Sequence, residues 1–279
     1  MHVAIIGVGL IGGSVARDLR RTGFATRITG VGSTPERSKI AVNLGLVDRT
    51  APLETAVREA DLVILAIPVD RIVTLLPRVL DLVDKQVVTD MGSTKQAIVD
   101  VIRNHPQRKR FVASHPMAGT ENSGPAAAQE HLFEGKVAVL CDLADSAPDA
   151  VKTVESLYKT LGMRLVYMDA VTHDLHAAYV SHLSHVVSYA LALATLEKEQ
   201  DEGAIFSLAS GGFASTARLA KSGPDMWVPI FRHNRAAVLD AIKTFRQKLD
   251  ALEAAIAAND TARLHALIKE ANYISKILP

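Results

Sequence analysis

A histidine at the end of an apolar run is the first residue of this chain that could do chemistry. His115 follows the run Phe111–Ser114 and precedes Pro116-Met117-Ala118-Gly119. An ordinary imidazole has a pKa of about 6.5 and can accept a proton near neutral pH. Ser93, in the segment Asp90–Lys95 after another apolar run, is expected to hydrogen-bond this imidazole and fix its tautomer. The alternative is a strand-end histidine that is satisfied by the backbone.

A glycine-rich turn near the N-terminus indicates the partner for such a base. Gly7, Gly9 and Gly12 follow the apolar run Val3–Ile6, and Leu10 and Ile11 continue the segment. This spacing is typical of a dinucleotide site, in which the glycines allow a tight turn, close approach of a pyrophosphate and close helix packing. The alternative is a structural turn with chance glycines. A nicotinamide cofactor and a base together would oxidise an alcohol.

The segment after the second apolar run bears on which nicotinamide cofactor is used. An acidic residue at this place usually binds the ribose hydroxyls of NAD. Here Gly32 is followed by Ser33, Thr34, Pro35, Glu36 and Arg37. We therefore expect Ser33, Thr34 and Arg37 to hold a 2′-phosphate, which favours NADP and leaves NAD as the alternative. Ile67 and Pro68, after the third run, complete the expected cofactor-binding set.

These residues must be positioned by an alternation of strands and helices. The pattern predicts a doubly wound, Rossmann-type parallel sheet with crossover helices. The candidate strands are Val3–Ile6, Arg27–Val31, Leu62–Ile67, Val87–Asp90, Phe111–Ser114, Lys136–Leu140 and Arg164–Tyr167. Helices are expected after Ser33 or Thr34, with Pro35 at the first helical position, after Pro68, and near Thr94.

The second part of the chain reads as helix only. Long helices are expected over 172–200, 224–258 and 261–278. We expect an NAD(P)-binding domain over residues 1–168 and a helical substrate and dimerisation domain over 169–279. The apolar residues of these helices fall on several faces, which favours a homodimer over a closed monomer core.

Composition excludes several other classes of function. The chain has 279 residues with 31 basic and 30 acidic side chains, so a nucleic-acid partner is not expected. The single cysteine, Cys141, and the lack of a signal-like N-terminus favour a cytoplasmic location. Serines and histidines within the apolar segment 177–196 favour a buried helix over a membrane span. His173, His176, His182 and His185 are too spread along one helix to bind a single ion, so no metal site is expected.

Five motifs, taken together and in order, resemble the prephenate/arogenate dehydrogenases of tyrosine biosynthesis. They cover nearly the whole chain. They are Gly7–Gly12, Asp90–Lys95, His115–Gly124, Ser181–His185 and Gly211–Arg218 followed by Met226-Trp227.

The resemblance implies an oxidative decarboxylation of a cyclohexadienyl alcohol. His115 would accept the hydroxyl proton while a hydride passes to the nicotinamide, and loss of CO2 would make the ring aromatic. Arg218 would bind the ring carboxylate as a bidentate, permanently charged fork. The motif also assigns further residues to the substrate pocket, with Trp227 either reaching it from the partner subunit or anchoring the core. These residues are Thr120, Glu121, Ser181, His185, Gly211 and Trp227.

Two other functions compete with this interpretation. One is another dehydrogenase with a Rossmann and a helical half, such as the β-hydroxyacid type, which would not explain the segment His115–Gly119. The other is a non-catalytic cofactor sensor, which would not need His115, Ser93 and Arg218 together. The choice between prephenate and arogenate stays open, although Glu121 could favour the ammonium group of arogenate.

Overall fold

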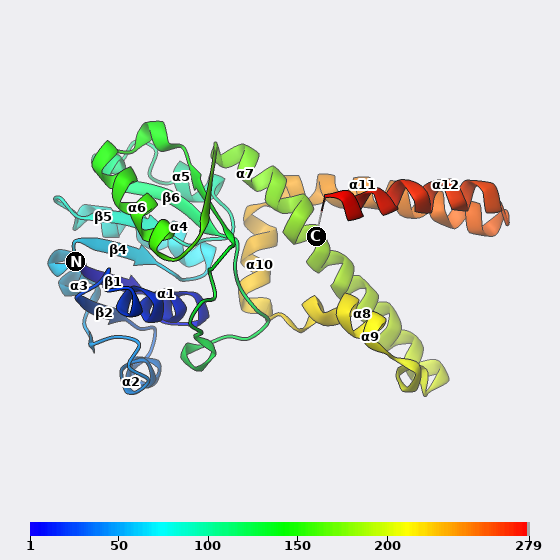
Figure 1. Cartoon of the computed structure of the whole chain (residues 1–279), viewed down its shortest axis with the longest axis horizontal. Coiled ribbons are helices and arrows are strands. Elements are labelled where there is room, and N and C mark those ends of the chain that lie inside the picture. The colour runs from blue at the N-terminus through cyan, green and yellow to red at the C-terminus, as the bar shows by residue number, and fades with distance from the viewer. Residues whose placement is uncertain (278–279) are drawn as a thin grey trace.

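The computed structural model describes residues 1–277, which form a sheet domain followed by an arrangement of helices (Figure 1). The sheet has eight strands in the order β3-β2-β1-β4-β5-β6-β7-β8. Their bounds are β1 His2–Ile6, β2 Arg27–Val31, β3 Arg49–Thr50, β4 Leu62–Leu65, β5 Val87–Asp90, β6 Phe111–Pro116, β7 Val137–Cys141 and β8 Arg164–Met168. Every predicted strand is present, with small shifts of its ends.

Two features of the sheet differ from the expectation of a wholly parallel arrangement. Strand β7 runs antiparallel to β6, while the other pairs are parallel. The residues between β6 and β7 form only a short 3₁₀ turn, Pro125–Ala127, and no crossover helix, so the chain returns in the opposite direction. The two-residue strand β3 was not predicted, because a pair such as Arg49-Thr50 has no alternation to recognise.

Helices cover both faces of this sheet. They are α1 Leu10–Arg21, α2 Pro35–Asn43, α3 Leu53–Glu59, α4 Val69–Asp81, α5 Gln96–Asp100 and α6 Pro148–Thr160. Alternate strand residues point to opposite faces, so Val3 and Ile5 pack with α1 and α6, while Ala4 and Ile6 pack with α3, α4 and α5. Each face thus has its own continuous core, and the sheet between them forms a rigid platform for the site.

After β8 the described residues contain helices and turns only. These helices are α7 Ala170–Ala177, α8 Leu183–Glu202, α9 Gly211–Ala217, α10 Pro224–His233, α11 Arg235–Ala257 and α12 Thr261–Ala271. The helix expected over 172–200 is present, but a π-helical turn, Ala178–His182, interrupts it between α7 and α8. The third expected helix ends at Ala271 in α12 and continues as the 3₁₀ segment Asn272–Lys276; its predicted last residue, Leu278, lies outside the described residues.

The expectation of one helix over 224–258 is wrong. The chain breaks at Asn234, which has φ −110° and ψ 31° and separates α10 from α11. Its side-chain Nδ2 donates to the carbonyl oxygen of Asp174 at 2.6 Å and lies 3.1 Å from Nδ1 of His182. These buried contacts hold Asn234 against α7, and they stabilise a break that the local sequence does not announce.

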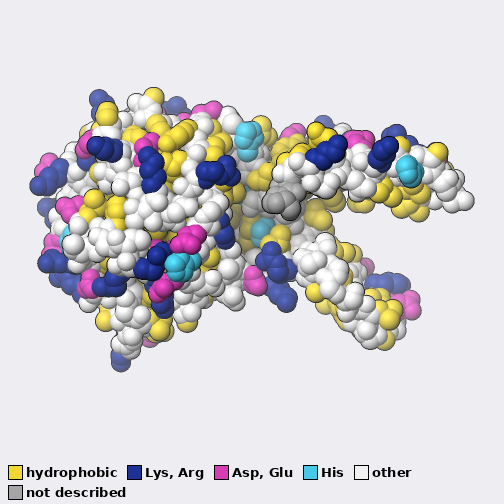
Figure 2. Space-filling model, in the orientation of Figure 1, with side chains coloured by type: hydrophobic (Ala, Val, Ile, Leu, Met, Phe, Trp, Pro, Cys, Tyr) yellow, Lys and Arg dark blue, Asp and Glu magenta, His cyan; other side chains and the backbone are white. Residues whose placement is uncertain are grey.

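The helices beyond the sheet domain extend as two separate arms. One arm contains α8 and α9 and the other contains α11 and α12, with α10 between them and the sheet domain (Figure 1). The space-filling view shows an open gap between the arms and hydrophobic side chains along them (Figure 2). The buried hydrophobic cluster at their junction consists of Ala178, Val238 and Ala241.

Candidate active site

The expected base and the expected cofactor turn lie at the same edge of the sheet. Gly7 directly follows β1, and β1, β4, β5 and β6 are neighbours in the sheet. The register pairs Thr89 of β5 with Val112 of β6, which puts Asp90, the last residue of β5, level with Ala113. His115 therefore lies two residues beyond the carboxyl end of β5. Three strand spacings separate β1 from β6, or about 14 Å. Carboxyl edges of parallel strands are where α/β proteins bind ligands.

The glycine turn has the geometry that a dinucleotide requires. Gly7 has φ +95°, and a Cβ there would come within 2.4 Å of the Ala66 carbonyl oxygen. A Cβ at Gly12 would lie 2.1 Å from the Gly7 carbonyl oxygen, whereas a Cβ at Gly9 would meet nothing within 4 Å. Gly9 also begins α1 without a side-chain cap, so the first N–H groups of the helix are free to bind an anion. The turn therefore fits a pyrophosphate.

The segment after β2 forms the wall of an open cavity. Thr34 caps α2, and its Oγ1 accepts a hydrogen bond from the Arg37 amide, with Pro35 at the first helical position as predicted. The cavity has a volume of about 570 Å³. Its lining residues are Gly32, Ser33, Thr34, Pro35, Ser38, Lys39, Val42, Asn43 and Thr50. The only carboxylate of the segment 31–37 belongs to Glu36, which is exposed in the first turn of α2.

His115 is buried, and its ring contacts a second histidine. Nδ1 of His115 lies 2.8 Å from Nε2 of His173 in α7. Burial lowers the pKa of His115 well below 6.5, and the nearby His173, Lys95 and His182 lower this pKa further. The ring is therefore neutral at neutral pH and has a lone pair available for a proton.

Ser93 does not make the hydrogen bond expected of it. Within residues 1–277 no hydrogen bond joins Ser93 to His115, and Nδ1 of the imidazole engages His173 of α7 instead. Ser93 is half-buried in the loop after β5. The contact predicted from the sequence is corrected, and the hydroxyl stays near the same edge of the sheet.

A buried ion pair holds the strand end that carries His115. Nζ of Lys95 donates to a carboxylate oxygen of Asp90 and, at 2.7 Å, to the Ser114 carbonyl oxygen, and both charged side chains are fully buried. The same carboxylate accepts the Gly92 and Ser114 amide hydrogens. Breaking such a pair leaves an uncompensated buried charge, so it fixes the loop after β5 against β6.

The helical arms bring the expected substrate residues together. Nη1 of Arg218 lies 3.2 Å from Oε2 of Glu121, joining the turn after α9 to the loop after β6. The His185 ring stacks on Trp227 with centroids 3.4 Å apart, and its Nδ1 lies 3.0 Å from the Ser181 carbonyl oxygen. Burial lowers the pKa of His185, its hydrogen bond to the Ser181 carbonyl oxygen raises this pKa, and the positive charge of Arg218 lowers it.

Trp227 and Gly211 complete the expected set, while Thr120 lies in the loop that carries Glu121. Trp227 is buried against His182 and His185 of its own chain. Gly211 begins α9, and Thr120 accepts a hydrogen bond from the Asn122 amide. His182 Nε2 and Trp227 Nε1 are buried without a hydrogen-bond partner among residues 1–277.

Family models match both parts of this chain. Residues 15–167 match the model described as "Prephenate dehydrogenase, nucleotide-binding domain", and residues 169–270 match "Prephenate dehydrogenase, dimerization domain". The chain belongs to the prephenate dehydrogenase family. The Rossmann-type sheet with a helical second part is the fold of this family, and the resemblance drawn from the five motifs is confirmed.

Individual members of the prephenate dehydrogenase family align over the whole chain. Prephenate dehydrogenase of Bacillus subtilis is 32% identical over 99% of this chain and 76% of its own length. The crystal structure of the Aquifex aeolicus prephenate dehydrogenase in complex with hydroxyphenyl propionate and NAD+ is 32% identical, covers 100% of this chain and 98% of its own, and has a TM-score of 0.89. Synechocystis arogenate dehydrogenase is 29% identical, with full coverage of both chains and a TM-score of 0.77.

The sequence analysis missed the buried polar residues behind the His115 ring: His173 contacts the ring, Asp174 contacts His173, and Asn234 contacts the Asp174 carbonyl oxygen. His173 and Asp174 lie 58 and 59 positions further along the chain, and Asn234 lies beyond another helix. The only available signal was the string of histidines on one helix, which was considered as a metal set and set aside. Among the described residues no cluster of histidine, cysteine and carboxylate groups suits a metal ion.

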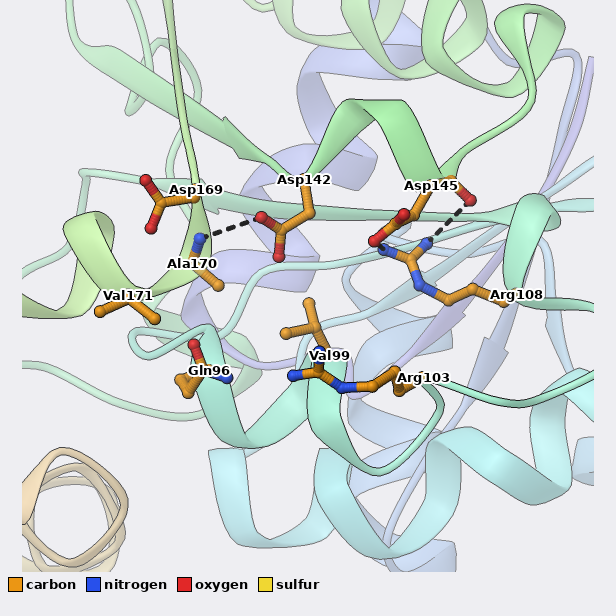
Figure 3. Close-up of a pocket in the computed structure, with 9 residues that line it drawn as sticks. All are labelled: Gln96, Val99, Arg103, Arg108, Asp142, Asp145, Asp169, Ala170 and Val171. Carbon is orange, nitrogen blue, oxygen red and sulfur yellow. Dashed lines mark hydrogen bonds and ion pairs between the residues drawn. The ribbon is translucent and has the colours of Figure 1, made fainter.

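A second, smaller cavity lies between α5 and the start of α7, and none of the predicted site residues lines it (Figure 3). It has a volume of about 210 Å³ and is lined by Gln96, Val99, Arg103, Arg108, Asp142, Asp145, Asp169, Ala170 and Val171. Its charged groups are largely satisfied within the protein: Arg108 pairs with Asp145, and Asp142 accepts the Ala170 amide hydrogen. Burial raises the pKa of Asp142.

Proposed function

We propose that this protein catalyses the oxidative decarboxylation of a cyclohexadienyl substrate, arogenate or prephenate, in tyrosine biosynthesis. The observation that carries the proposal is the buried, neutral His115 at the same sheet edge as a glycine turn that fits a pyrophosphate. Membership of the prephenate dehydrogenase family supports it. The β-hydroxyacid and sensor alternatives leave the combination of His115 and Arg218 without a use.

In the proposed reaction His115 handles a single proton. The substrate hydroxyl loses its proton to His115, and the bound nicotinamide supplies the hydride acceptor for the carbon that carries this hydroxyl. The bond between the ring and its carboxylate then breaks, CO2 leaves, and the bonding electron pair enters the ring. The oxygen, now a phenolate, takes the proton back from His115. Such a base typically contributes a factor of about 10² to 10⁴ in rate.

Arg218 is proposed to bind the carboxylate that is lost as CO2. It is about half exposed and paired with Glu121, so its charge is partly neutralised before substrate arrives. A substrate carboxylate would replace a carboxylate partner that Arg218 already has. Thr120, Glu121, Ser181, His185, Gly211 and Trp227 are proposed to surround the rest of the substrate, and Ser93 to lie at the reacting end.

NADP is proposed as the preferred cofactor. The cavity after β2 offers the Ser33 and Thr34 hydroxyls and, in addition, the Lys39 ammonium, and Arg37 lies in the same turn. The segment 31–35 has no acid to accept the ribose hydroxyls of NAD. Gly7, Gly9, Leu10, Ile11, Gly12, Ile67 and Pro68 are proposed to hold the rest of the dinucleotide, as they would for either cofactor.

The two parts of the chain are proposed to divide these tasks, with residues 1–168 binding the cofactor and 169–279 supplying substrate contacts and a dimer interface.

The helix over Ala170–Glu202 is long and apolar enough to cross a membrane, and only 28% of its most apolar window is buried in the protomer. Its Ser188 hydroxyl nevertheless donates to the Thr216 carbonyl oxygen and accepts the Ala220 amide hydrogen. We therefore propose that a second copy covers this helix and that the protein works in the cytoplasm.

The experiment that tests the function is a steady-state assay of all four combinations of substrate and cofactor. The absorbance of the reduced cofactor is followed with arogenate or prephenate and NADP or NAD. We expect turnover with at least one substrate and a higher kcat/KM with NADP than with NAD. In His115→Asn we expect kcat to fall by about 10²- to 10⁴-fold, while the dinucleotide affinity stays unchanged. His131→Asn, at a surface position with φ 61° that suits asparagine, is the control. No turnover in any combination would remove the proposed function.

A second variant tests the carboxylate assignment. Arg218→Ala should raise KM for the substrate by about 10- to 100-fold, since a charge-assisted bidentate contact contributes about 1.5–3 kcal/mol. We expect a smaller change in kcat, because the contact is made in the ground state as well as in the transition state. Arg103→Ala, at an exposed arginine near the second cavity, is the control. An unchanged KM for Arg218→Ala would contradict the assignment.

A further inference from the structure

The imidazole of His115 is the first member of a buried chain of three side chains. Its Nδ1 lies 2.8 Å from Nε2 of His173, and Nδ1 of His173 lies 2.8 Å from Oδ1 of Asp174. His173 and Asp174 are consecutive residues of α7, and all three side chains are buried. Asp174 in turn accepts the backbone N–H of Lys95 at 2.7 Å and that of Gln96 at 2.9 Å. The chain therefore ends on a carboxylate held in place by the N-terminal turn of α5.

The donors and acceptors along this chain determine where the protons lie. The Asp174 carboxylate is an acceptor for two amides, so His173 Nδ1 must carry the hydrogen that points to it. With that hydrogen on Nδ1, Nε2 is the nitrogen of His173 that is left to accept. His115 Nδ1 must therefore be the donor, and the His115 lone pair lies on Nε2.

We propose that His173 and Asp174 are positioning residues that hold His115 in the Nδ1–H tautomer, so that Nε2 is the atom that takes the substrate proton. This inference deepens the proposed function and depends on it only for the identity of the proton donor. The structure assigns to His173 the role that the sequence analysis gave to Ser93.

The same chain acts on the charge that His115 gains during the reaction. The groups facing His115 are His173 of α7, the Lys95 ammonium after β5 and His182 of the π-helical turn, and each of them lowers its pKa. Lys95 is paired with Asp90. Asp174 is the carboxylate at the far end of the histidine pair, where it compensates the imidazolium through the hydrogen bond. The proton itself stays on His115 Nε2 until the phenolate takes it back, so no proton leaves the site.

The tautomer can be measured without turnover. In protein labelled with ¹⁵N-histidine, the His115 signals, assigned by their loss in His115→Asn, should show a protonated Nδ1 and a bare Nε2 near neutral pH. In His173→Leu the acceptor is gone, and we expect the signals to move toward the Nε2–H form or an average. A protonated Nε2 in the unaltered protein would overturn the proposal, even if the enzyme turns substrate over. A correct tautomer in a protein without turnover would instead count against the proposed function alone.

Kinetics of matched variants separate positioning from simple structural support. His173→Leu should lower kcat by the order of 10²-fold with little change in substrate KM, because the hydrogen-bond acceptor of His115 Nδ1 is lost. His173→Gln retains an oxygen that can accept from His115 Nδ1, so it should recover at least about a tenth of the lost activity. Asp174→Asn should move the acid limb of the pH profile to lower pH, because it removes the negative charge that compensates the imidazolium.

The control is His176, an exposed histidine three residues further along the same helix. His176→Leu should leave kcat, the pH profile and the ¹⁵N signals of His115 unchanged. Thermal unfolding and dinucleotide binding of each variant report whether the fold is kept. A His173→Leu variant with kcat within twofold of the unaltered enzyme would overturn the proposal. Equal losses in His173→Leu and His173→Gln, with an unchanged acid limb in Asp174→Asn, would overturn it as well.

Discussion

At the scale of single residues, buried neutral histidines make the stability of this protein depend on pH. Burial lowers the pKa of His182 to about 4, with further lowering from His173 and His185 and an opposing effect of Asp174. Its Nδ1 accepts from the Asn234 amide, and its Nε2 has no partner among residues 1–277. A proton on this ring would thus be poorly accommodated in the folded state.

The sign of the effect follows from proton binding in the two states. The unfolded chain protonates this histidine near pH 6.5, while the folded chain resists until about pH 4. Below pH 6.5 the unfolded state therefore binds more protons, and the free energy of unfolding falls as the pH falls through this window. We expect His182 to remove about 1–2 kcal/mol of stability between pH 7 and pH 5.

Denaturant unfolding at pH 7 and pH 5 checks this prediction. His182→Gln should lose less stability over this interval than the unaltered protein, even if it starts from a lower value. The exposed His131→Gln should keep the full loss. If His182→Gln and the unaltered protein lost the same amount, the pH sensitivity would have to come from other groups.

Residue types alone could indicate His115 as a candidate base, but they could not indicate its hydrogen-bond partner. His115 and the glycines were recognisable because strand ends and the GxGxxG spacing are local signals. His173 carries no such signal, since an imidazole becomes a hydrogen-bond partner of another only when the sheet and α7 bring two distant positions to 2.8 Å. The misassigned contact of Ser93 has the same origin: the loop places it at the correct edge, but the direction of a ring nitrogen depends on tertiary packing.

At the scale of elements, the turn before α1 contains glycines that are expected for two different reasons: one leaves space for a ligand, and the other lets the helix pack closely on the sheet. A Cβ at Gly9 would meet no atom of the protein, and this residue has a negative φ of −102°, so alanine should fit the fold. A Cβ at Gly12 would clash with the Gly7 backbone. We therefore expect Gly9 to be needed for the ligand and Gly12 to be needed for the packing of α1 on β1.

Two alanine variants test this separation. Gly9→Ala should keep the free energy of unfolding within about 1 kcal/mol and raise the dinucleotide Kd at least about tenfold, because the methyl group occupies the space of the pyrophosphate. Gly12→Ala should lower the free energy of unfolding by about 1–3 kcal/mol, since backbone must move to relieve the overlap. Denaturant titration and fluorescence-detected binding give the two quantities. Unchanged dinucleotide affinity in Gly9→Ala would place the pyrophosphate elsewhere.

Elements with local signals were predictable, and those set by tertiary contacts were not. Thr34 and Pro35 begin α2 as expected, because a cap and a proline at the first position act within four residues. The break at Asn234 depends on the Asp174 carbonyl and His182, which are more than fifty residues away. The direction of β7 likewise depends on a connection without a helix, whose consequence appears only when the strands pair.

At the scale of the whole molecule, the arms have the character of half an interface. The outer parts of α8 and α11 expose large aliphatic side chains, including Leu193 at 67% and Ile256 at 65%. The arms diverge from the sheet domain with an open gap between them (Figure 2). Their own buried cluster is small, so much of their apolar surface gains burial only from another chain. The match to a dimerization domain over residues 169–270 agrees with a second copy as that chain.

We expect the protein to be a dimer that Leu193→Asp and Ile256→Asp weaken. In a twofold interface each substitution occurs twice, and two buried carboxylates at about 2 kcal/mol or more each should raise the dimer Kd by about 10³-fold. Light scattering across a dilution series measures this shift. Val101→Asp, at an exposed apolar position of the sheet domain, is the control and should leave the mass unchanged. A monomeric unaltered protein, or a dimer insensitive to both arm variants, would mean that the exposed arm surfaces are not the interface.

Because Trp227 and His185 lie at the base of the arms, loss of the dimer should also lower activity. A fully active monomer would show that each protomer contains a complete site.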